Sequence, residues 1–323
     1  MKRRLARLWP LAIAAVALSA STALAATSTP PKPKATSGSA TQITYDSATV
    51  DGSANPEGAA TEVYFEYGTS TSYGSNSAPI PLNGSTTQAV SAPLTGLAAY
   101  TTYDFRVVAV NANGTTYGAN AHFKTAKIPL SLQIVASPNP ITYGGLLTVA
   151  GTLSGTGNAN QPVALQQNPY PYTAGFSQVG NSELTSSTGA YSFTVPALDM
   201  STEYRVVNTT NPNVVSSTVL VTDSLLVTVH THAAGTRAHP ATRFYGSVAP
   251  ASETDAKFAI QELFGHTWKL VNGGITASQA SDGVVHFSKV VPFKHGGFFR
   301  IFVGTVQGAN AESFSAPVVA RGY

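Results

Sequence analysis

The sequence predicts an all-β protein, with three tandem antiparallel β-sandwich domains after a signal peptide. Short runs rich in Val, Ile, Tyr, Phe and Thr alternate with clusters of Gly, Pro, Asn and Ser along the 323 residues, and no window keeps a helical apolar period. The 28 Gly and 20 Pro residues suit frequent turns. Segments of the second half recur after about 95 residues, close to the size of a seven-strand sandwich.

The first 25 residues have the three parts of a secretory signal peptide. A basic start precedes the largely apolar run 8–18, and small residues stand at the cleavage positions Ala23-Leu24-Ala25. We therefore expect a secreted protein that is extracellular or associated with the cell surface. An uncleaved membrane anchor is the alternative, but Pro10 and the small residues from Ser19 onward favour cleavage.

Removal of the signal peptide changes the charge of the protein. The chain has 18 basic and 15 acidic residues, and the first 25 residues contain four of the basic ones, so the mature chain has 14 against 15 and a net charge of −1. Charged residues make up only 10% of the chain, against about 25% in typical proteins. We expect no nucleic-acid partner and no stable membrane insertion after cleavage. The chain has no Cys, so disulfides cannot stabilise it.

The Pro-rich residues 26–35 predict an extended linker. The turn clusters and the repeat then place the domains at 36–126, 127–222 and 223–323, and we expect the protein to be a monomer. Within the first domain, alternating apolar and polar residues predict strands at 61–68 and 103–109, and a third run at 121–125 closes the domain.

The first domain contains a specific pattern around its predicted strand at 103–109. Leu97 is followed by Thr101 and Tyr103, and the strand then ends at Asn111 and Gly114. In this pattern, over about 90 residues from Ala40 to Thr125, the domain resembles a fibronectin type III module of the bacterial form. The resemblance implies that the Tyr103 hydroxyl folds back onto the chain as a tyrosine corner. The sequence departs from the family in having no Trp on the second strand and Ala99 where Pro is common. Arg-Gly-Asp is absent, which gives no support to integrin-type adhesion.

The second and third domains read as two copies of one sandwich. Four pairs of segments correspond: Gly151 with 163–166 and Gly246 with 258–261; Phe176 with Val179 and Trp268 with Val271; 189–193 and 283–287; 204–206 and 299–301. Both domains are similar to immunoglobulin-like repeats of bacterial surface proteins. Leu198, Thr202 and Tyr204 repeat the corner spacing, and the third copy has Phe293, Gly297 and Phe299 there, without a hydroxyl.

The sequence contains no pattern that predicts catalysis. The nucleophile elbow Gly-x-Ser-x-Gly is absent, and the 15 acidic residues are scattered. Glu62 and Glu66 share one strand face, but we interpret them as solvated charges on the exposed side. No phosphate-binding glycine loop is present. We predict a protein that is not an enzyme and that needs no cofactor.

Histidine is distributed unevenly, because six of the seven lie between His230 and His295. His230 and His232 would project from the same side of a strand, as two metal ligands must. His239 or Glu262 could supply a third ligand, but no acidic residue or Cys stands at a recognised zinc spacing. We therefore predict no metal site and keep His230, His232 and His239 as the candidates if one exists.

Aromatic residues are the candidate binding groups. Tyr170 and Tyr172 lie in a Pro-rich loop, and Trp268 stands at the equivalent place in the third domain. Exposed rings of this kind can stack on sugars or join an interface. Because the feature recurs in both copies, a shared structural role is the competing interpretation.

The leading hypothesis for function is a secreted, non-catalytic interaction and spacing module with an unknown extracellular protein or glycan as its partner. One alternative is a carbohydrate-binding accessory protein that uses Tyr170, Tyr172 or Trp268. A second alternative is a metal-dependent protein that uses the His-rich third domain.

Overall fold

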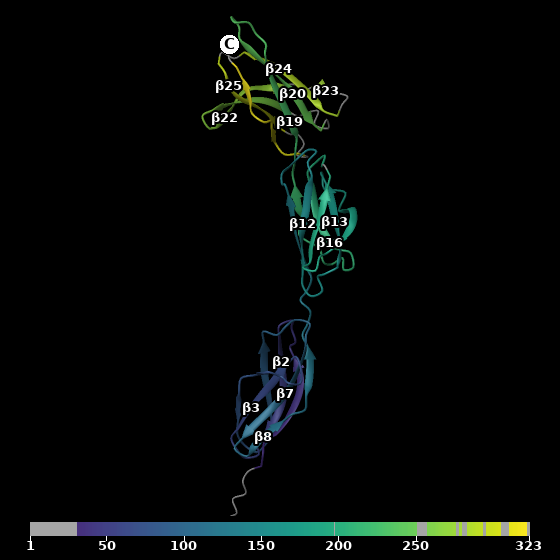
Figure 1. The fold of residues 1–323 in the computed structure, drawn as a ribbon, viewed down its shortest axis with the longest axis vertical. Coiled ribbons are helices and arrows are strands. Elements are labelled where there is room, and N and C mark those ends of the chain that lie inside the picture. Colours follow the sequence, from purple (N-terminus) through teal and green to yellow (C-terminus); the bar gives the residue numbers. More distant parts are fainter. Residues whose placement is uncertain are drawn as a thin grey trace, which may run out of the picture. The chain divides into compact units, whose positions relative to one another are not determined.

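The computed structural model describes residues 31–196, 198–250, 257–275, 278–279, 283–292, 295–304 and 310–321. The predicted signal peptide, most of the predicted linker and Phe293 lie outside these residues. Regular structure in the described part of the chain consists of strands, and the predicted all-β fold class is confirmed (Figure 1). No described segment forms a helix with the length and apolarity needed to cross a membrane.

The chain divides into two compact units, the first ending at Thr125 and the second beginning at Ala126. Unit 1 is a sandwich of two antiparallel sheets. The first sheet has the order β1-β2-β6, with β1 at Lys34–Thr41, β2 at Ser47–Asn55 and β6 at Gln88–Thr95. β1 therefore begins inside the predicted linker, whose last two residues belong to the sheet.

The second sheet of unit 1 has the order β4-β3-β7-β8, with β5 beside β3 and β9 beside β7. Its strands are β3 at Thr61–Gly68, β4 at Ser75–Asn76, β5 at Ile80–Leu82, β7 at Thr102–Asn111, β8 at Gly114–Tyr117 and β9 at Ala121–Lys124. The three strands predicted in this domain are present. Phe65, Phe105 and Val107 are fully buried between the sheets, as the alternation of β3 and β7 requires.

The predicted tyrosine corner of unit 1 is present. The backbone N–H of Ala98 donates a hydrogen bond of 2.9 Å to the Tyr103 hydroxyl. The Tyr103 ring also stacks on Phe123, with 5.8 Å between the ring centroids. The corner thus fixes the chain before β7 to the end of the sandwich.

The first half of unit 2 has its own apolar core between two antiparallel sheets. One sheet has the order β10-β12-β15, with β10 at Ser131–Ser137, β12 at Leu147–Ser154 and β15 at Ala190–Val195. The other has the order β14-β13-β16-β17, with β14 at Ser177–Leu184, β13 at Pro162–Pro169, β16 at Thr202–Asn208 and β17 at Val219–Val221. A short parallel pair joins β11 at Ile141–Thr142 to β18 at Asp223–Ser224.

The second half of unit 2 has a separate core built in the same way. One sheet has the order β19-β20-β24-β23, with β19 at Leu226–Ala233, β20 at Ala241–Ala249, β24 at Val285–Pro292 and β23 at Ser278–Gln279. The other has the order β22-β21-β25-β26 with β27 beside β25. Its strands are β22 at Thr267–Ile275, β21 at Lys257–Phe264, β25 at Gly297–Gly304, β26 at Ser313–Phe314 and β27 at Val318–Ala320.

The strand register supports the repeat and corrects one part of it. Gln166 faces Arg205 across β13 and β16, and Gln261 faces Arg300 across β21 and β25, as the repeat predicts. Across the other sheet, the partner of Gly151 is Tyr191 and that of Gly246 is Phe287.

The sequence comparison instead matches Phe193 with Phe287, and this match is wrong by two residues. The turn glycines that precede these strands, Gly189 and Gly283, do correspond, with φ of 84° and 82°. The third copy has two more residues between that glycine and the paired position. A shift of two leaves the alternation of buried and exposed residues unchanged, so the pattern alone could not reveal it.

Candidate functional site

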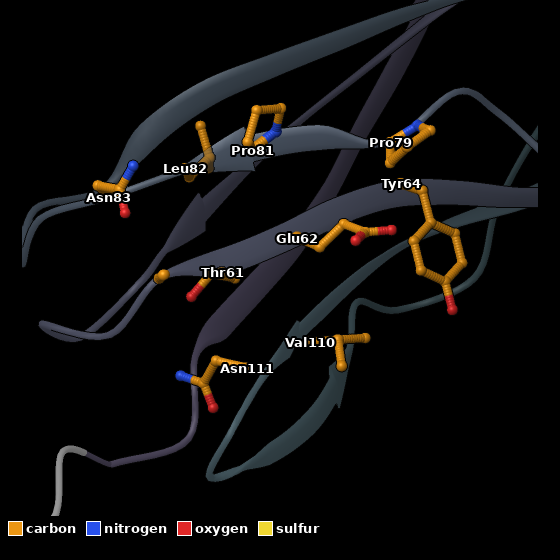
Figure 2. Close-up of a pocket in the computed structure, with 10 residues that line it drawn as sticks. Thr61, Glu62, Tyr64, Pro79, Pro81, Leu82, Asn83, Val110 and Asn111 are labelled. Carbon is orange, nitrogen blue, oxygen red and sulfur yellow. The ribbon is translucent and has the colours of Figure 1, made fainter.

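Unit 1 carries a groove of about 790 Å³ on the outer side of its larger sheet. Figure 2 shows Tyr64 and Pro79 at one end and Asn83 at the other, with Glu62 between them. The other residues along the groove come from neighbouring strand ends and connections: Ala60, Thr61, Pro81, Leu82, Val110 and Asn111. The groove therefore combines one aromatic ring and several apolar side chains with a carboxylate and two amides.

Strand alternation and register place these side chains together. Successive residues of β3 point to opposite faces, so Val63 and Phe65 enter the core while Glu62 and Tyr64 face outward. β5 pairs with the first half of β3 and brings Pro81 opposite Glu62. β7 pairs on the other side and brings Val110 opposite Glu62. The groove is thus built on strands, except at its three loop residues Ala60, Pro79 and Asn83.

Tyr64 remains a neutral hydrogen-bonding group in this groove. The pKa of the Tyr64 phenol is raised, and burial is the largest cause. The negative charges of Glu66 and Glu62 raise this pKa further, whereas the positive charge of Arg106 lowers it. The Glu62 carboxylate is exposed and has no ion-pair partner among the described residues. A phenol donor and a carboxylate acceptor therefore lie on one wall.

The neighbouring charge pair is structural. Nε and Nη2 of Arg106 both lie 2.7 Å from Oε2 of Glu66, and the guanidinium carbon lies 4.0 Å from the Tyr117 ring centroid and 4.7 Å from that of Tyr73. Val108, which lies on the same outer face of β7, is completely buried. The interpretation of Glu66 as a solvated charge is therefore wrong, because its partner Arg106 is held between rings.

The structure places Tyr170 and Tyr172 in the predicted loop, where the two rings pack against each other. Their centroids lie 5.6 Å apart with an edge-to-face angle of 86°. The Asn168 amide, which is buried, donates to the Tyr172 carbonyl at 3.1 Å and to the Glu203 carboxylate at 2.9 Å. Burial, with smaller effects of Glu203 and Tyr170, raises the pKa of Tyr172. The loop is well held, and binding by these rings stays a prediction.

Trp268 has a structural role that repeats between the copies. The Arg300 guanidinium carbon lies 4.5 Å from the Trp268 centroid, and that of Arg205 lies 4.1 Å from the Phe176 centroid. In both copies the arginine Nε also donates a hydrogen bond of 2.8 Å to the facing glutamine. The recurrence of the aromatic residue is explained by this arginine stack, and sugar binding by Trp268 stays a prediction.

The candidate metal ligands do not form a common site in the described residues. His230 and His232 lie on the exposed side of β19, as predicted for one strand face, and His239 lies in the turn from Thr236. Glu262 belongs to the other sheet and is buried, where it pairs with His295 Nε2 at 2.9 Å. Within the described part of the chain, no group of three or more His, Cys, Asp or Glu side chains could hold a metal ion.

Sequence reasoning did not find the groove of unit 1. Its apolar wall comes from Pro79, which precedes the short strand β5, from Pro81 inside that strand, and from Val110 on a distant strand. The only local signal was the sequence Pro79-Ile80-Pro81, which is unusual for a strand that needs backbone donors. The contribution of Val110 depends on the register of β3 with β7, which the sequence alone does not give.

No protein-family model matches this sequence, and no match to it was found among curated proteins. Among solved structures, the chain is similar to the sensor domain of the anti-sigma factor RsgI4 in Pseudobacteroides cellulosolvens, with 20% identity and a TM-score of 0.26, over 29% of this chain and 94% of that one. It is also similar to the chicken CNTN1 FN1-FN3 domains, with 16% identity and a TM-score of 0.29, over 91% of this chain and 100% of that one. The described residues form antiparallel β-sheets packed as sandwiches, so the fold class is all-β. At these TM-scores, the likenesses carry no argument about activity or partner.

Proposed function

We propose that this protein is a secreted, monomeric, non-catalytic interaction module, and that the groove of unit 1 is its ligand site. The observation that carries the proposal is the groove itself, in which Tyr64 stands beside the exposed carboxylate of Glu62 on a rigid sheet. Concave sites with an apolar lining and a few polar groups are the usual binding sites of proteins. In this proposal unit 2 supplies the spacing part of the role.

A carbohydrate is the ligand that the groove favours. The ring of Tyr64 offers a face for stacking on a sugar, and Glu62, Asn83 and Asn111 offer acceptors and donors for sugar hydroxyls. The groove is open along the sheet, which suits a chain of sugars better than a single small molecule. The carbohydrate-binding alternative is thus retained, with Tyr64 in place of Tyr170, Tyr172 and Trp268 as its main ring.

A glycan array probed with the mature chain tests this proposal. We expect binding to one class of neutral oligosaccharide, with affinity lowered at least tenfold by Tyr64→Ala and severalfold by Glu62→Gln. Tyr45→Ala is the matched control, because Tyr45 is an exposed tyrosine of unit 1 that does not line the groove. Binding that survives Tyr64→Ala would remove the groove from the proposal, and an equal loss with Tyr45→Ala would show a nonspecific effect.

Secretion and the absence of catalysis have their own tests. N-terminal sequencing of secreted protein should give a start at or near Ala26, and intact Met1 chain in the cytosol would contradict secretion.

The mature chain should not turn over ester, peptide or glycan substrates with or without added zinc. Turnover that is lost in a variant with alanine at His230 and His232 would favour the metal-dependent alternative.

A further inference from the structure

The β19-β20-β24-β23 sheet of unit 2 carries a second group of exposed polar and aromatic side chains. Its outer side carries a group of hydrogen-bond donors around one exposed ring, which we call the Tyr245 face: Thr228, His230, His232, Arg243, Tyr245, Ser247, His286 and Ser288. Tyr245 is 42% exposed, and its ring centroid lies 5.5 Å from that of His230. This face lies on a different unit from the groove and uses none of its residues.

The register sets these side chains in rows across the sheet. His230 pairs with Tyr245 and Tyr245 with Ser288, which makes the central row. His232 pairs with Arg243 on one side of this row. On the other side, Ser247 stands between Thr228 and His286. An imidazole or a guanidinium thus flanks the ring in each direction along the sheet.

Two hollows lie on either side of Tyr245. One has about 390 Å³ and is lined by Thr228, His230, Ser247 and His286 among others. The other has about 410 Å³ and is lined by His232, Arg243 and Ser288, and Tyr245 lines both. A third hollow joins His232 to Arg321 at the edge of the sheet. The ring is therefore a ridge with a donor-lined depression on each flank.

The charge of this sheet points to an anionic ligand. None of its four strands contains Asp or Glu. Arg243 is always charged, and each imidazole can donate an N–H whichever nitrogen carries the proton. A ligand that carries carboxylates suits this face, because the strands of the sheet have no carboxylate that would compete for the donors or repel the ligand.

The second sandwich shows that the fold does not require these residues. The same register positions there hold Val135 for His230, Ala150 for Tyr245 and Thr148 for Arg243. Both sheets keep the same pairing with these different outer side chains. The Tyr245 face is thus present in only one copy of the repeat. This is expected of residues kept for binding, and not of residues that the fold requires.

We propose that the Tyr245 face binds an acidic polysaccharide, a chain of sugars that carry carboxylates. Tyr245 would stack on one sugar, while Arg243 and the histidines would donate to carboxylates of its neighbours in the two hollows. The alternatives of a nucleic acid or a membrane fit less well. Only one arginine lies at the centre of the face, and the mature chain has a net charge of −1, whereas those ligands select clusters of Lys and Arg.

Binding of polygalacturonate to the full mature chain tests this inference, with its methyl-esterified form as the uncharged probe of the same backbone. We expect polygalacturonate to bind, the ester not to bind, and added salt to weaken the complex. Arg243→Gln and Tyr245→Ala should each raise the dissociation constant at least tenfold. Lys269→Gln is the matched control, since it removes the same charge from an exposed position on the other sheet and should change binding less than twofold.

Several results would overturn the inference. These are no binding of polygalacturonate, equal binding of the ester, or an equal loss with Lys269→Gln. Tighter binding of a DNA duplex or of phosphatidylserine vesicles would assign the face to another class of partner.

Arg243 is exposed, so the Arg243→Gln variant should fold. An unchanged unfolding midpoint, followed by Trp268 fluorescence, checks this for both variants. Tyr64→Ala should leave polygalacturonate binding unchanged, so failure here and failure of the groove are distinguishable.

Discussion

The second and third sandwiches share their strand pairing and the arginine stack on their second sheet, and they differ on the outer side of their first sheet. Both keep a glycine where two strands meet closely and an arginine that faces a glutamine: Gly151, Arg205 and Gln166 in one, and Gly246, Arg300 and Gln261 in the other. On the outer side of the first sheet, Val135, Thr148 and Ala150 of one copy correspond to His230, Arg243 and Tyr245 of the other. Strand pairing and core thus specify the sandwich, and the outer positions of the first sheet are left to diverge. Specific binding should therefore be sought where the copies differ.

The largest expected effect concerns a buried acid that the second copy lacks. Asp223 is fully buried at the start of the third copy, whereas the residue 95 positions earlier is the exposed Ile128. Burial is the largest cause that raises the pKa of Asp223 to about 7, Asp199 adds to it, and the Ser224 N–H opposes it. The folded state therefore holds this proton more tightly than the unfolded chain does. Its contribution to the free energy of unfolding decreases as the pH rises from about 4 through 7.

We expect Asp223→Asn to raise the free energy of unfolding at pH 8 by up to about 4 kcal/mol, and to change it little at pH 4. Urea unfolding followed by Trp268 fluorescence measures this in the mature chain, where Trp268 is the only Trp. Asp199→Asn, at an exposed position, is the control and should have a much smaller effect. Equal stabilisation at both pH values would contradict the ionisation argument.

The next effect tests the shared interior. A Cβ atom at Gly246 would collide with the carbonyl oxygen of Thr228, and one at Gly151 with that of Gln133. We expect Gly246→Ala and Gly151→Ala to destabilise their own sandwich by similar amounts, roughly 3 kcal/mol. Trp268 fluorescence reports the third sandwich, and Phe176→Trp in a Trp268→Phe background reports the second.

Gly273→Ala is the control for these glycine variants, because a Cβ there meets no atom within 4 Å. A large effect in one copy and none in the other would show that the two interiors are less alike than their registers indicate.

Part of this architecture could be predicted from the sequence, because period-2 alternation and turn residues are local signals. Strands β3, β7 and β9 of unit 1 follow from such signals, whereas the corner at Tyr103 was implied by the resemblance to fibronectin type III modules. The match of Phe193 with Phe287 failed because alternation repeats every two residues and cannot detect a two-residue insertion. The groove and the Tyr245 face depend on which strands pair and in which register, and no local signal of this sequence specified that.

A smaller effect separates the two arginine stacks. Arg300 lies between two rings, 4.5 Å from the Trp268 centroid and 3.9 Å from that of Phe314, whereas Arg205 is 4.1 Å from Phe176. Burial lowers the pKa of Arg300, a sign that its charge is partly removed from water. Cation–π contacts are stronger when desolvated, so we expect Arg300→Met to cost about 2 kcal/mol and Arg205→Met about 1 kcal/mol. The same two fluorescence reporters measure both, and equal losses would show that the second ring adds nothing.

The smallest effect extends the comparison to the corner tyrosines. In unit 1, Tyr103→Phe leaves the Ala98 N–H without its acceptor and should lower the free energy of unfolding by about 1 kcal/mol. In the second sandwich, the Tyr204 hydroxyl is buried, and no backbone donor of the described residues reaches it. Burial is the largest cause that raises its pKa to about 12, and the Thr202 side chain opposes this rise. Tyr204→Phe therefore removes a polar group that gains little from folding, and we expect no loss or a slight gain in stability.

Hydrogen exchange measured by mass spectrometry follows β7 and β16 separately in one chain. Faster exchange in β7 for the first variant and unchanged or slower exchange in β16 for the second is the expected result, whereas equal losses would mean that both tyrosines close their corners through the hydroxyl.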